Sequence, residues 1–252
     1  MIDWAAVALV GAAGLAAGTI NTVVGSGTLI TFPVLLALGV PPVTANVSNT
    51  IGLVPGSVSG AWSYRRELAG QTARLVRLGG ASLVGGIAGA LLLLTLPAGA
   101  FKAIVPVLII LALGLVVTQP WLARRLAGSP ERGARARPVL LWAAVMLTGV
   151  YGGYFGAAQG VLLIAILGSL VEANLQRMNA VKNVLTGLVN GIAGILFVIL
   201  AHPDWVYVGV IAVASAIGGP VGGVIGRRLP PLVLRGVIVV VGVAALIKFL
   251  LG

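Results

Sequence analysis

Long runs of apolar residues, broken by short polar or glycine-rich clusters, extend along the whole chain. A first set of five apolar stretches covers residues 4–24, 29–40, 43–62, 75–96 and 100–118. A second set of five covers residues 139–155, 161–171, 178–201, 205–225 and 232–250. Most of these stretches approach the roughly 20 residues that a helix needs to cross a hydrocarbon core about 30 Å thick. The pattern predicts an all-α polytopic membrane protein.

The composition agrees with this fold class and excludes several others. Of the 252 residues, 59% are hydrophobic and 8% are charged, whereas a soluble domain has about 25% charged residues. The net charge of +11 comes from basic residues in short loops, without the basic helix and interleaved aromatic residues that nucleic-acid binding requires. The absence of cysteine excludes disulfides and thiolate metal sites, and we expect neither a metal nor a cofactor. No Lys or Arg precedes Arg65, so the first stretch reads as a retained membrane segment and not as a cleaved signal peptide.

The two sets of stretches resemble each other at a spacing of about 133 residues. The matching pairs are Leu96-Pro97 with Leu229-Pro230, Gly85-Gly86 with Gly218-Gly219, Gly25 with Gly156, and Ser48-Asn49 with Lys182-Asn183. The sequence therefore predicts an internal duplication, with a first transmembrane repeat over residues 1–118, an Arg-rich linker over 119–138 and a second repeat over 139–252.

Basic residues predict the orientation of the two repeats. Twelve of the 16 Lys and Arg residues lie in three loops: Arg65, Arg66, Arg74 and Arg77; Arg124, Arg125, Arg132, Arg135 and Arg137; and Arg227, Arg228 and Arg235. Cytoplasmic loops retain such residues, so the linker is expected to be cytoplasmic and both chain ends to lie outside. The loops near Pro97 and His202 then lie outside, each repeat has an odd number of crossings, and the repeats have inverted topology.

The second stretch of each repeat, at about a dozen residues, is too short to span a membrane comfortably. A glycine-containing turn precedes it in each half, Gly25-Ser26-Gly27-Thr28 in the first and residues 156–160, GAAQG, in the second. We interpret each repeat as a broken or re-entrant helix pair followed by three membrane helices. Irregular backbone at membrane depth is tolerated only inside protein or beside a wet cavity, so the two turns mark the expected transport site.

A polar stripe on one helical face supports this assignment. Asn179, Lys182, Asn183, Thr186 and Asn190 follow helical spacing, and such a stripe must face the interior of the bundle. The corresponding residues of the first half are Asn46, Ser48, Asn49, Thr50 and Ser57. Asn and Thr side chains of this kind also join helices without binding any ligand, and Lys182 has the alternative of extending to the cytoplasmic surface.

The glycine turns add a second reason to expect an anion. Amides at the start of the two short helices would present the positive end of a helix dipole, and glycine allows a close approach. The predicted substrate-binding residues are Asn21, Gly25, Ser26, Gly27, Thr28, Asn46, Ser48, Asn49, Gln159, Gly160, Asn179, Lys182, Asn183 and Thr186. The other glycines, such as Gly85, Gly89, Gly218 and Gly222, are expected to serve close helix packing.

Several motifs carry a family resemblance that covers nearly the whole chain. They are GTINTVVGSGTLITFP at residues 18–33, NVSN at 46–49, YRRE at 64–67, GGYFG at 152–156 and NAVKN at 179–183. With these motifs the chain resembles the sulfite exporter TauE/SafE family, the toluene-sulfonate uptake permeases. The resemblance implies transport of small sulfur-containing or organic anions, such as sulfite, sulfonates or sulfoacetate, across the bacterial inner membrane. The second turn departs from the family, because Ala157, Ala158 and Gln159 stand where many members carry more glycine.

Three other functions are compatible with parts of this sequence. An anion channel and a non-transporting membrane scaffold share the same helical pattern. An intramembrane serine protease would need a base beside Ser26, yet His202, the one histidine, falls in a loop expected outside.

All five acids lie at or near segment ends, so we expect no carboxylate proton carrier at mid-membrane. The partners expected are a small anionic substrate and membrane lipid, and the many small residues favour a homodimer.

Overall fold

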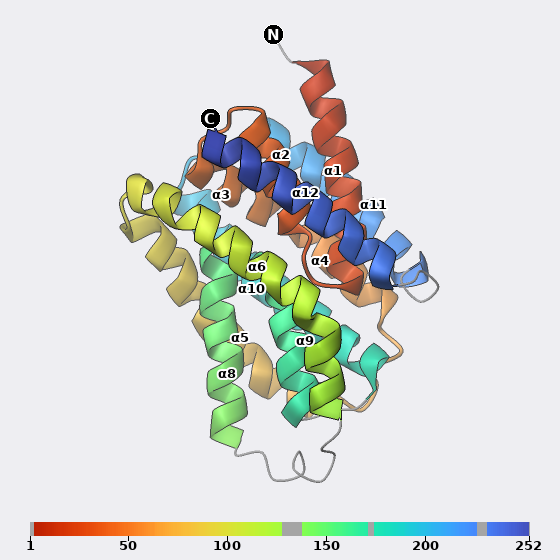
Figure 1. The fold of residues 1–252 in the computed structure, drawn as a ribbon. Coiled ribbons are helices and arrows are strands. Elements are labelled where there is room, and N and C mark those ends of the chain that lie inside the picture. The colour runs from red at the N-terminus through yellow and green to blue at the C-terminus, as the bar shows by residue number, and fades with distance from the viewer. Residues whose placement is uncertain (1–2, 128–137, 171–173, 226–230, 252) are drawn as a thin grey trace.

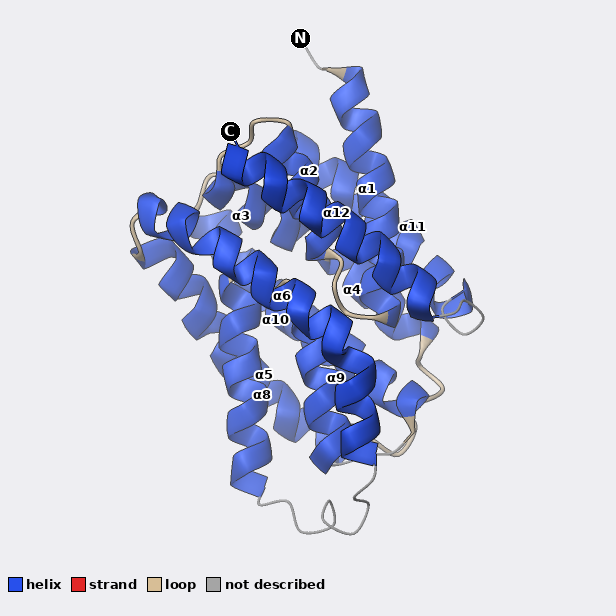
Figure 2. Cartoon of the chain, viewed as in Figure 1, coloured by secondary structure: helices blue, strands red, loops and turns tan. Residues whose placement is uncertain are grey.

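The computed structural model describes residues 3–127, 138–170, 174–225 and 231–251, and every regular element in these ranges is a helix (Figures 1 and 2). The helices that precede the Arg-rich linker are α1 (Trp4–Val23), α2 (Thr28–Ala37), α3 (Pro42–Gly52), α4 (Val54–Ser63), α5 (Thr72–Thr95) and α6 (Ala98–Ala127). Those that follow it are α8 (Pro138–Tyr154), α9 (Gln159–Leu170), α10 (Leu175–Leu200), α11 (Trp205–Ile225) and α12 (Pro231–Leu251). The helical fold class predicted from the sequence is confirmed.

Proline residues account for two differences from the expected segments. The stretch 43–62 forms two helices that meet at Leu53, because Pro55 has no N–H to continue the hydrogen-bond ladder. Conversely, α6 continues through Ala127 instead of ending at Thr118, so the prediction that the loop begins at residue 119 is wrong. Pro120 lies inside this helix, as proline can in membrane helices. The rest of the predicted linker, residues 128–137, lies outside the described residues.

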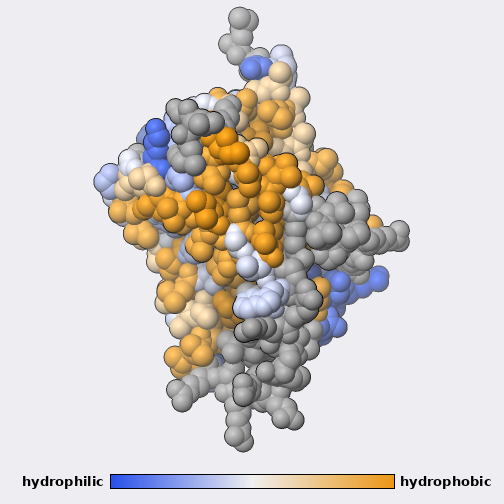
Figure 3. Space-filling model, viewed as in Figure 1, coloured by the Kyte–Doolittle hydropathy of each residue, from blue (hydrophilic) through white to orange (hydrophobic). Residues whose placement is uncertain are grey.

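Five of the described helices, α1, α5, α6, α10 and α11, contain segments long and apolar enough to cross a membrane. Helices α2, α8 and α9 are apolar but shorter. Large apolar side chains such as Val107, Leu147 and Val213 are exposed on the outside of the bundle, and Figure 3 shows apolar side chains over much of the described surface on one face. Such a surface is stable in contact with lipid and unsuited to water.

Two long helix pairs join the first half of the chain to the second. Helix α1 packs against α11, and α5 packs against α8. Small residues line both contacts: Gly18 lies against Ser215 and Gly218 against Leu15, while Gly85 lies against Met146 and Gly89 against Val150. A Cβ atom at Gly18, Gly218, Gly85 or Gly89 would lie 2.0–2.4 Å from a backbone oxygen of the facing helix. The expectation that Gly85, Gly89, Gly218 and Gly222 serve close packing is confirmed.

The order of these contacts sets the helix directions. Residue numbers rise together on both helices of each pair, from Gly14 beside Ala214 to Gly222 beside Thr22, and from Gly85 beside Met146 to Gly89 beside Val150. Each pair is therefore parallel. Figure 1 shows α1 starting at the end of the molecule marked N, whereas α8 starts at the opposite end, where α6 finishes.

An aromatic cluster packs beside the turn that follows α8. The Phe155 ring meets the Phe32 ring of α2 edge-on, with 5.2 Å between centroids, and the Phe101 ring of α6 at 6.2 Å. All three side chains are buried. Edge-to-face pairs of this kind add about 0.5–1.5 kcal/mol each beyond the burial of their area. The cluster therefore holds α2, α6 and the turn after α8 in one arrangement.

Candidate functional site

The two glycine turns touch each other at the centre of the site. Gly25 has φ +86° and Gly156 has φ +77°, a backbone conformation that favours glycine. The carbonyl of Gly25 accepts a hydrogen bond from the amide of Gly160 at 3.1 Å. A Cβ atom at Gly25 would lie 2.3 Å from the Gly160 Cα, so the two chains meet backbone to backbone. Segments of opposite halves are thus in contact at their irregular points.

Lys182 closes the end of the interrupted helix α1. Its ammonium donates hydrogen bonds of 2.9 Å to the carbonyl oxygens of Asn21 and Thr22, and the Asn183 amide donates to the same Thr22 oxygen at 3.2 Å. These carbonyls belong to the last turn of α1, where a helix has no partners of its own and carries the negative end of its dipole. The side chain of Lys182 is fully buried, so the alternative in which it extends to the membrane surface is wrong.

Helix α10 presents the predicted polar stripe to the interior. Asn179, Lys182, Asn183, Thr186 and Asn190 are all buried. The two acceptors of Lys182 are neutral main-chain oxygens, and among the described residues no carboxylate is bonded to its ammonium. Two main-chain carbonyl dipoles therefore hold the amino group of Lys182 inside the protein, and an anion nearby would favour its charged form.

Side chains of the first half organise the opposite flank. The Asn49 amide donates to the Thr28 hydroxyl at 3.1 Å and its carbonyl accepts from the Thr31 hydroxyl. The Asn46 amide donates to the Tyr154 carbonyl at 2.9 Å, which gives the end of α8 a neutral donor where the end of α1 has an ammonium. The site is asymmetric in charge although the two halves match in outline.

The second turn carries backbone strain. Ala158 has φ +59° although it is not glycine, a conformation that costs an L-residue about 1–2 kcal/mol. A hydrogen bond of 2.5 Å from the Tyr151 hydroxyl to the Ala157 carbonyl supports the turn. The departure from a glycine-rich turn noted in the sequence is therefore built at a conformational cost.

Six buried polar atoms around the two turns have no hydrogen-bond partner among the described residues: Ser26 Oγ, Gln159 Oε1 and Nε2, Asn46 Oδ1, Asn179 Oδ1 and Thr186 Oγ1. Buried polar groups in proteins are nearly always paired, so each exception needs an explanation. Ser26 follows Gly25 and Gln159 precedes Gly160, so both adjoin the contact between the turns, and Asn179 and Thr186 share a face of α10 with Lys182. A bound ligand at the turns would supply the missing partners.

Several main-chain amides of the turns are already occupied. The amides of Leu29 and Ile30 donate to Ser26 and Gly27, that of Gln159 donates to Gly156, and that of Gly160 donates to Gly25. The Gly27 amide points at the Asn21 side-chain oxygen at 3.5 Å. In this conformation, side chains have more unused capacity for a ligand than these amides do.

Most of the predicted site residues converge, with one exception. Asn21, Gly25, Ser26, Gly27, Thr28, Asn46, Asn49, Gln159, Gly160, Asn179, Lys182, Asn183 and Thr186 are buried on the segments that form the turns or contact them. The Ser48 hydroxyl instead accepts from the Asp204 amide at 2.8 Å, beside the start of α11. Ser48 matches Lys182 in the sequence comparison of the two halves, but in the structure its hydroxyl bonds the loop that precedes α11.

Sequence reasoning missed Thr22, Thr31 and Tyr154, whose oxygens take part in this network. The Thr31 side chain could have been found, because it lies one helical turn after Thr28 on α2. Thr22 and Tyr154 contribute backbone carbonyls, and hydrogen bonds to these cannot be predicted from residue type.

Acidic residues do not enter the site in the described parts of the chain. Asp3 caps α1 by accepting from the amides of Ala5 and Ala6, and Asp204 caps α11 in the same way. No group of three metal-ligating side chains occurs in the parts of the chain that were searched. Glu131 and Glu172 lie outside the described residues.

Helices of spanning length, two interrupted helices that meet, and a buried polar centre around Lys182 are together typical of a multi-pass membrane transport protein. Residues 10–249 match the family model described as Sulfite exporter TauE/SafE, and the chain belongs to this family. The resemblance seen in the sequence is confirmed. The family consists of transporters and not enzymes, and no base is bonded to Ser26 among the described residues, so the protease interpretation is wrong.

Curated relatives carry consistent names. "Probable membrane transporter protein YfcA" of Escherichia coli is 27% identical over 237 residues, which cover 93% of this chain and 86% of the relative. A "Probable membrane transporter protein" of Haemophilus influenzae is 28% identical over 207 residues, covering 82% of this chain and 79% of the relative. The "Probable membrane transporter protein ORF9" of a Sinorhizobium species is 31% identical over 145 residues, covering 57% and 54%. No solved structure matches the chain.

Proposed function

We propose that this transporter carries small sulfur-containing or organic anions, such as sulfite, sulfonates or sulfoacetate, across the bacterial inner membrane. The binding site lies where the turns around Gly25 and Gly160 meet. One observation carries the proposal: unpartnered buried polar atoms occur on the two turns and on the face of α10 that carries Lys182, whose amino group has no bonded carboxylate among the described residues. An oxyanion supplies both the negative charge and the acceptor oxygens that such a centre lacks.

The side chains have different roles in this proposal. Lys182 supplies the attractive charge while two of its three donors remain on α1. The hydroxyls of Ser26 and Thr186 and the amide of Gln159 donate to the anion, since each has unused donor capacity. Thr28, Asn46, Asn49 and Asn183 position the turns through the bonds they already make.

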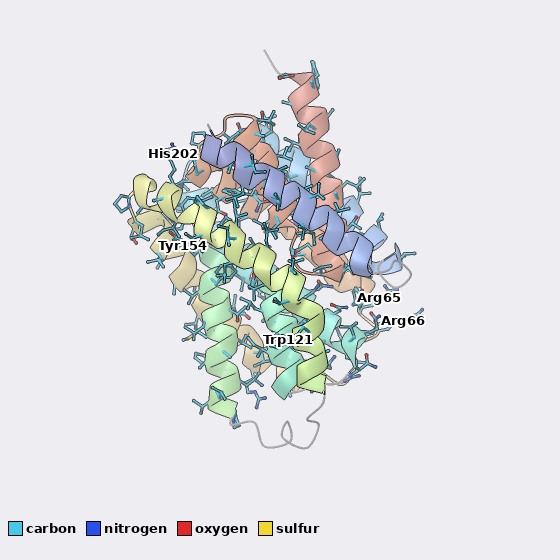
Figure 4. All side chains as sticks on the ribbon, in the orientation of Figure 1. Arg65, Arg66, Trp121, Tyr154 and His202 are labelled. Atoms are coloured by element: carbon cyan, nitrogen blue, oxygen red, sulfur yellow. The ribbon has the colours of Figure 1, made fainter. Side chains whose placement is uncertain are left out.

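The arrangement of the halves supports inverted-topology repeats over residues 1–118 and 139–252, joined by a cytoplasmic linker. Helix α1 pairs with α11 as α8 pairs with α5, each pair is parallel, and α1 and α8 start at opposite ends of the molecule. Figure 4 shows Arg65 and Arg66 on the opposite side of the molecule from His202. In this proposal the Arg65 side is cytoplasmic, because basic residues are retained there.

A ligand screen tests the proposal. The purified protein is melted in the presence of sulfite, sulfate, thiosulfate, taurine, sulfoacetate or simple carboxylates, since a ligand that binds only the native state must raise its stability. We expect a sulfur oxyanion to raise the melting temperature. Concentrative uptake of that anion into vesicles then distinguishes a carrier from a channel or a scaffold.

A matched pair of serine variants locates the site. Ser26 and Ser82 are both buried with unpartnered hydroxyls, but Ser82 lies on α5 in the contact with α8. We expect Ser26→Ala to lose most of the anion-dependent shift and Ser82→Ala to keep it. A full anion-dependent shift in Ser26→Ala, or an equal loss of the shift in both variants, would contradict an anion site at the turns.

A further inference from the structure

A surface cavity with a mostly apolar lining lies apart from the residues of the glycine turns. Its volume is about 490 Å³, and it lies between the end of α4 and the end of α11, with Trp62, Arg65 and Arg66 on one wall and Pro220, Gly223 and Val224 on the other. Figure 4 places its two arginines side by side at the edge of the molecule. The cavity thus combines two positive charges with an apolar wall.

One of the two arginines of this cavity, Arg65, is held in place by Trp62. The Arg65 guanidinium lies over the Trp62 ring, 4.9 Å from its centroid, and donates to the Trp62 carbonyl at 3.2 Å. Stacking on an aromatic face fixes the planar fork of an arginine while leaving its outer edge open. Neither Arg65 nor Arg66 is paired with a carboxylate in the described parts of the chain, and the cavity lining contains no acid. The charge available there is about two units positive.

The floor of the cavity separates it from the proposed transport site. Ser63 lies so close to α11 that a Cβ at Gly223 would be 2.4 Å from the Ser63 Cβ. One turn deeper, a Cβ at Gly219 would be 2.1 Å from the Ser59 hydroxyl oxygen. These contacts close α4 against α11, so the cavity is not an entrance for the transported anion.

The opening of the cavity faces the place where lipid headgroups lie. Trp62 is 67% exposed and Val224 is 63% exposed, an exposure suited to the boundary between water and acyl chains. Tryptophan is enriched at this boundary, and basic pockets between helices on the cytoplasmic side hold anionic headgroups. A free inorganic anion has no apolar part that could pack against the apolar wall, so the wall favours a lipid over such an ion.

We propose that the cavity between α4 and α11 is a binding site for an anionic phospholipid of the cytoplasmic leaflet. The phosphodiester lies between Arg65 and Arg66, and an acyl chain runs along Pro220 and Val224. This site is independent of the anion bound at the glycine turns, so the proposed transport function can fail without affecting it.

Native mass spectrometry of the full chain in neutral detergent tests the site, with dioleoyl phosphatidylglycerol and dioleoyl phosphatidylcholine as probes. We expect the wild type to bind phosphatidylglycerol preferentially. Each basic residue near a membrane surface contributes about fivefold in affinity, so R65Q and R66Q should each lose about fivefold and the double variant about thirtyfold. R77Q is the matched control, because Arg77 is an exposed arginine of α5 outside the cavity lining, and it should change binding less than twofold.

Each remaining outcome contradicts the proposal. Equal losses in R77Q and R65Q would reduce the effect to general surface charge. Unchanged phosphatidylglycerol binding in the double variant would show that the lipid binds outside this cavity. If glycerophosphoglycerol, the headgroup without chains, bound as tightly as the lipid, the ligand would be a soluble phosphate ester instead. Melting in phosphatidylcholine confirms that each variant is folded.

Discussion

The ammonium of Lys182 is both a hydrogen-bond donor to the end of α1 and a positive charge inside the protein. Its bonds to the Asn21 and Thr22 carbonyls satisfy groups that an interrupted helix leaves without partners. In the described parts of the chain no carboxylate is bonded to this group, so its charged form is available to attract an anion. Two uncharged substitutions of nearly equal size separate these roles, because Gln keeps donors and Met has none.

We expect Lys182→Met to be less stable than Lys182→Gln by about 1–3 kcal/mol, since Met leaves the buried Asn21 carbonyl unpaired. Both variants should lose the anion-dependent rise in melting temperature, because both lack the charge. Equal stability of the two variants would contradict the capping role. A wild-type anion shift in Lys182→Gln would contradict the role of the charge.

The contact between Gly25 and Gly160 gives a second prediction for single residues. Gly25 and Gly39 both have positive φ, but a Cβ at Gly25 would meet the Gly160 backbone, whereas a Cβ at Gly39 would meet nothing within 4 Å. Gly39→Ala should therefore cost only the conformational strain, about 1–2 kcal/mol. Gly25→Ala should cost about 1–3 kcal/mol more from overpacking and abolish transport. Chemical denaturation and vesicle uptake measure both, and similar stability of the two variants would show that the turns do not touch.

The residues of the site were easier to predict than their roles. Asn179, Lys182 and Asn183 could be placed on one face because helical spacing alone decides it. The partner of Lys182 could not be predicted, because it is a pair of backbone carbonyls some 160 positions away in the chain. The same limit applies to Ser48, whose sequence match to Lys182 says nothing about its bond to Asp204.

At the scale of helices, interruptions and close contacts decide the architecture. The apolar stretches of the sequence located nearly every helix, and α11 spans the predicted residues 205–225. Two proline positions differ from the expected segments: Pro55 breaks a stretch that was expected to be continuous, and Pro120 lies inside a helix that was expected to have ended. Whether proline ends a helix depends on the packing around it, which the local sequence does not contain.

One substitution at two positions of α5 tests the close contact between helices. Gly89 faces α8, and a Cβ there would lie 2.0 Å from the Val150 carbonyl, whereas Gly80 is exposed with nothing within 4 Å. Gly80→Ala should stabilise the protein by about 0.5–1 kcal/mol through helix propensity. Gly89→Ala should destabilise it by about 1–3 kcal/mol through overpacking. Melting temperatures measured in one detergent give the sign of each change, and effects of the same sign would contradict the packing.

At the scale of the whole molecule, the two predicted repeats interlock. The sequence predicts a duplication from matching glycine and polar positions, but it does not predict that α1 packs with α11 and α8 with α5. Those contacts depend on which glycine faces meet, and several glycine faces of similar composition occur in the chain. Helices from both halves of the chain contribute side chains to the same two hydrophobic clusters.

Cysteine labelling tests the orientation of the whole molecule, because the chain contains no cysteine of its own. Arg66 and His202 are exposed and lie on opposite sides of the molecule in Figure 4. In intact cells an impermeant thiol reagent should label His202→Cys and leave Arg66→Cys unlabelled until the membrane is opened. The reverse result would invert the assigned orientation, and labelling of both from outside would contradict a membrane crossing between them.

The parallel pairing of α1 with α11 also constrains how the protein is made. At a synthesis rate of about 5–20 residues per second, α11 leaves the ribosome roughly 10–40 s after α1 is complete. Throughout that interval the glycine face around Gly14 and Gly18 has no helix to pack against. The first half of the chain therefore cannot complete this packing until α11 has been made.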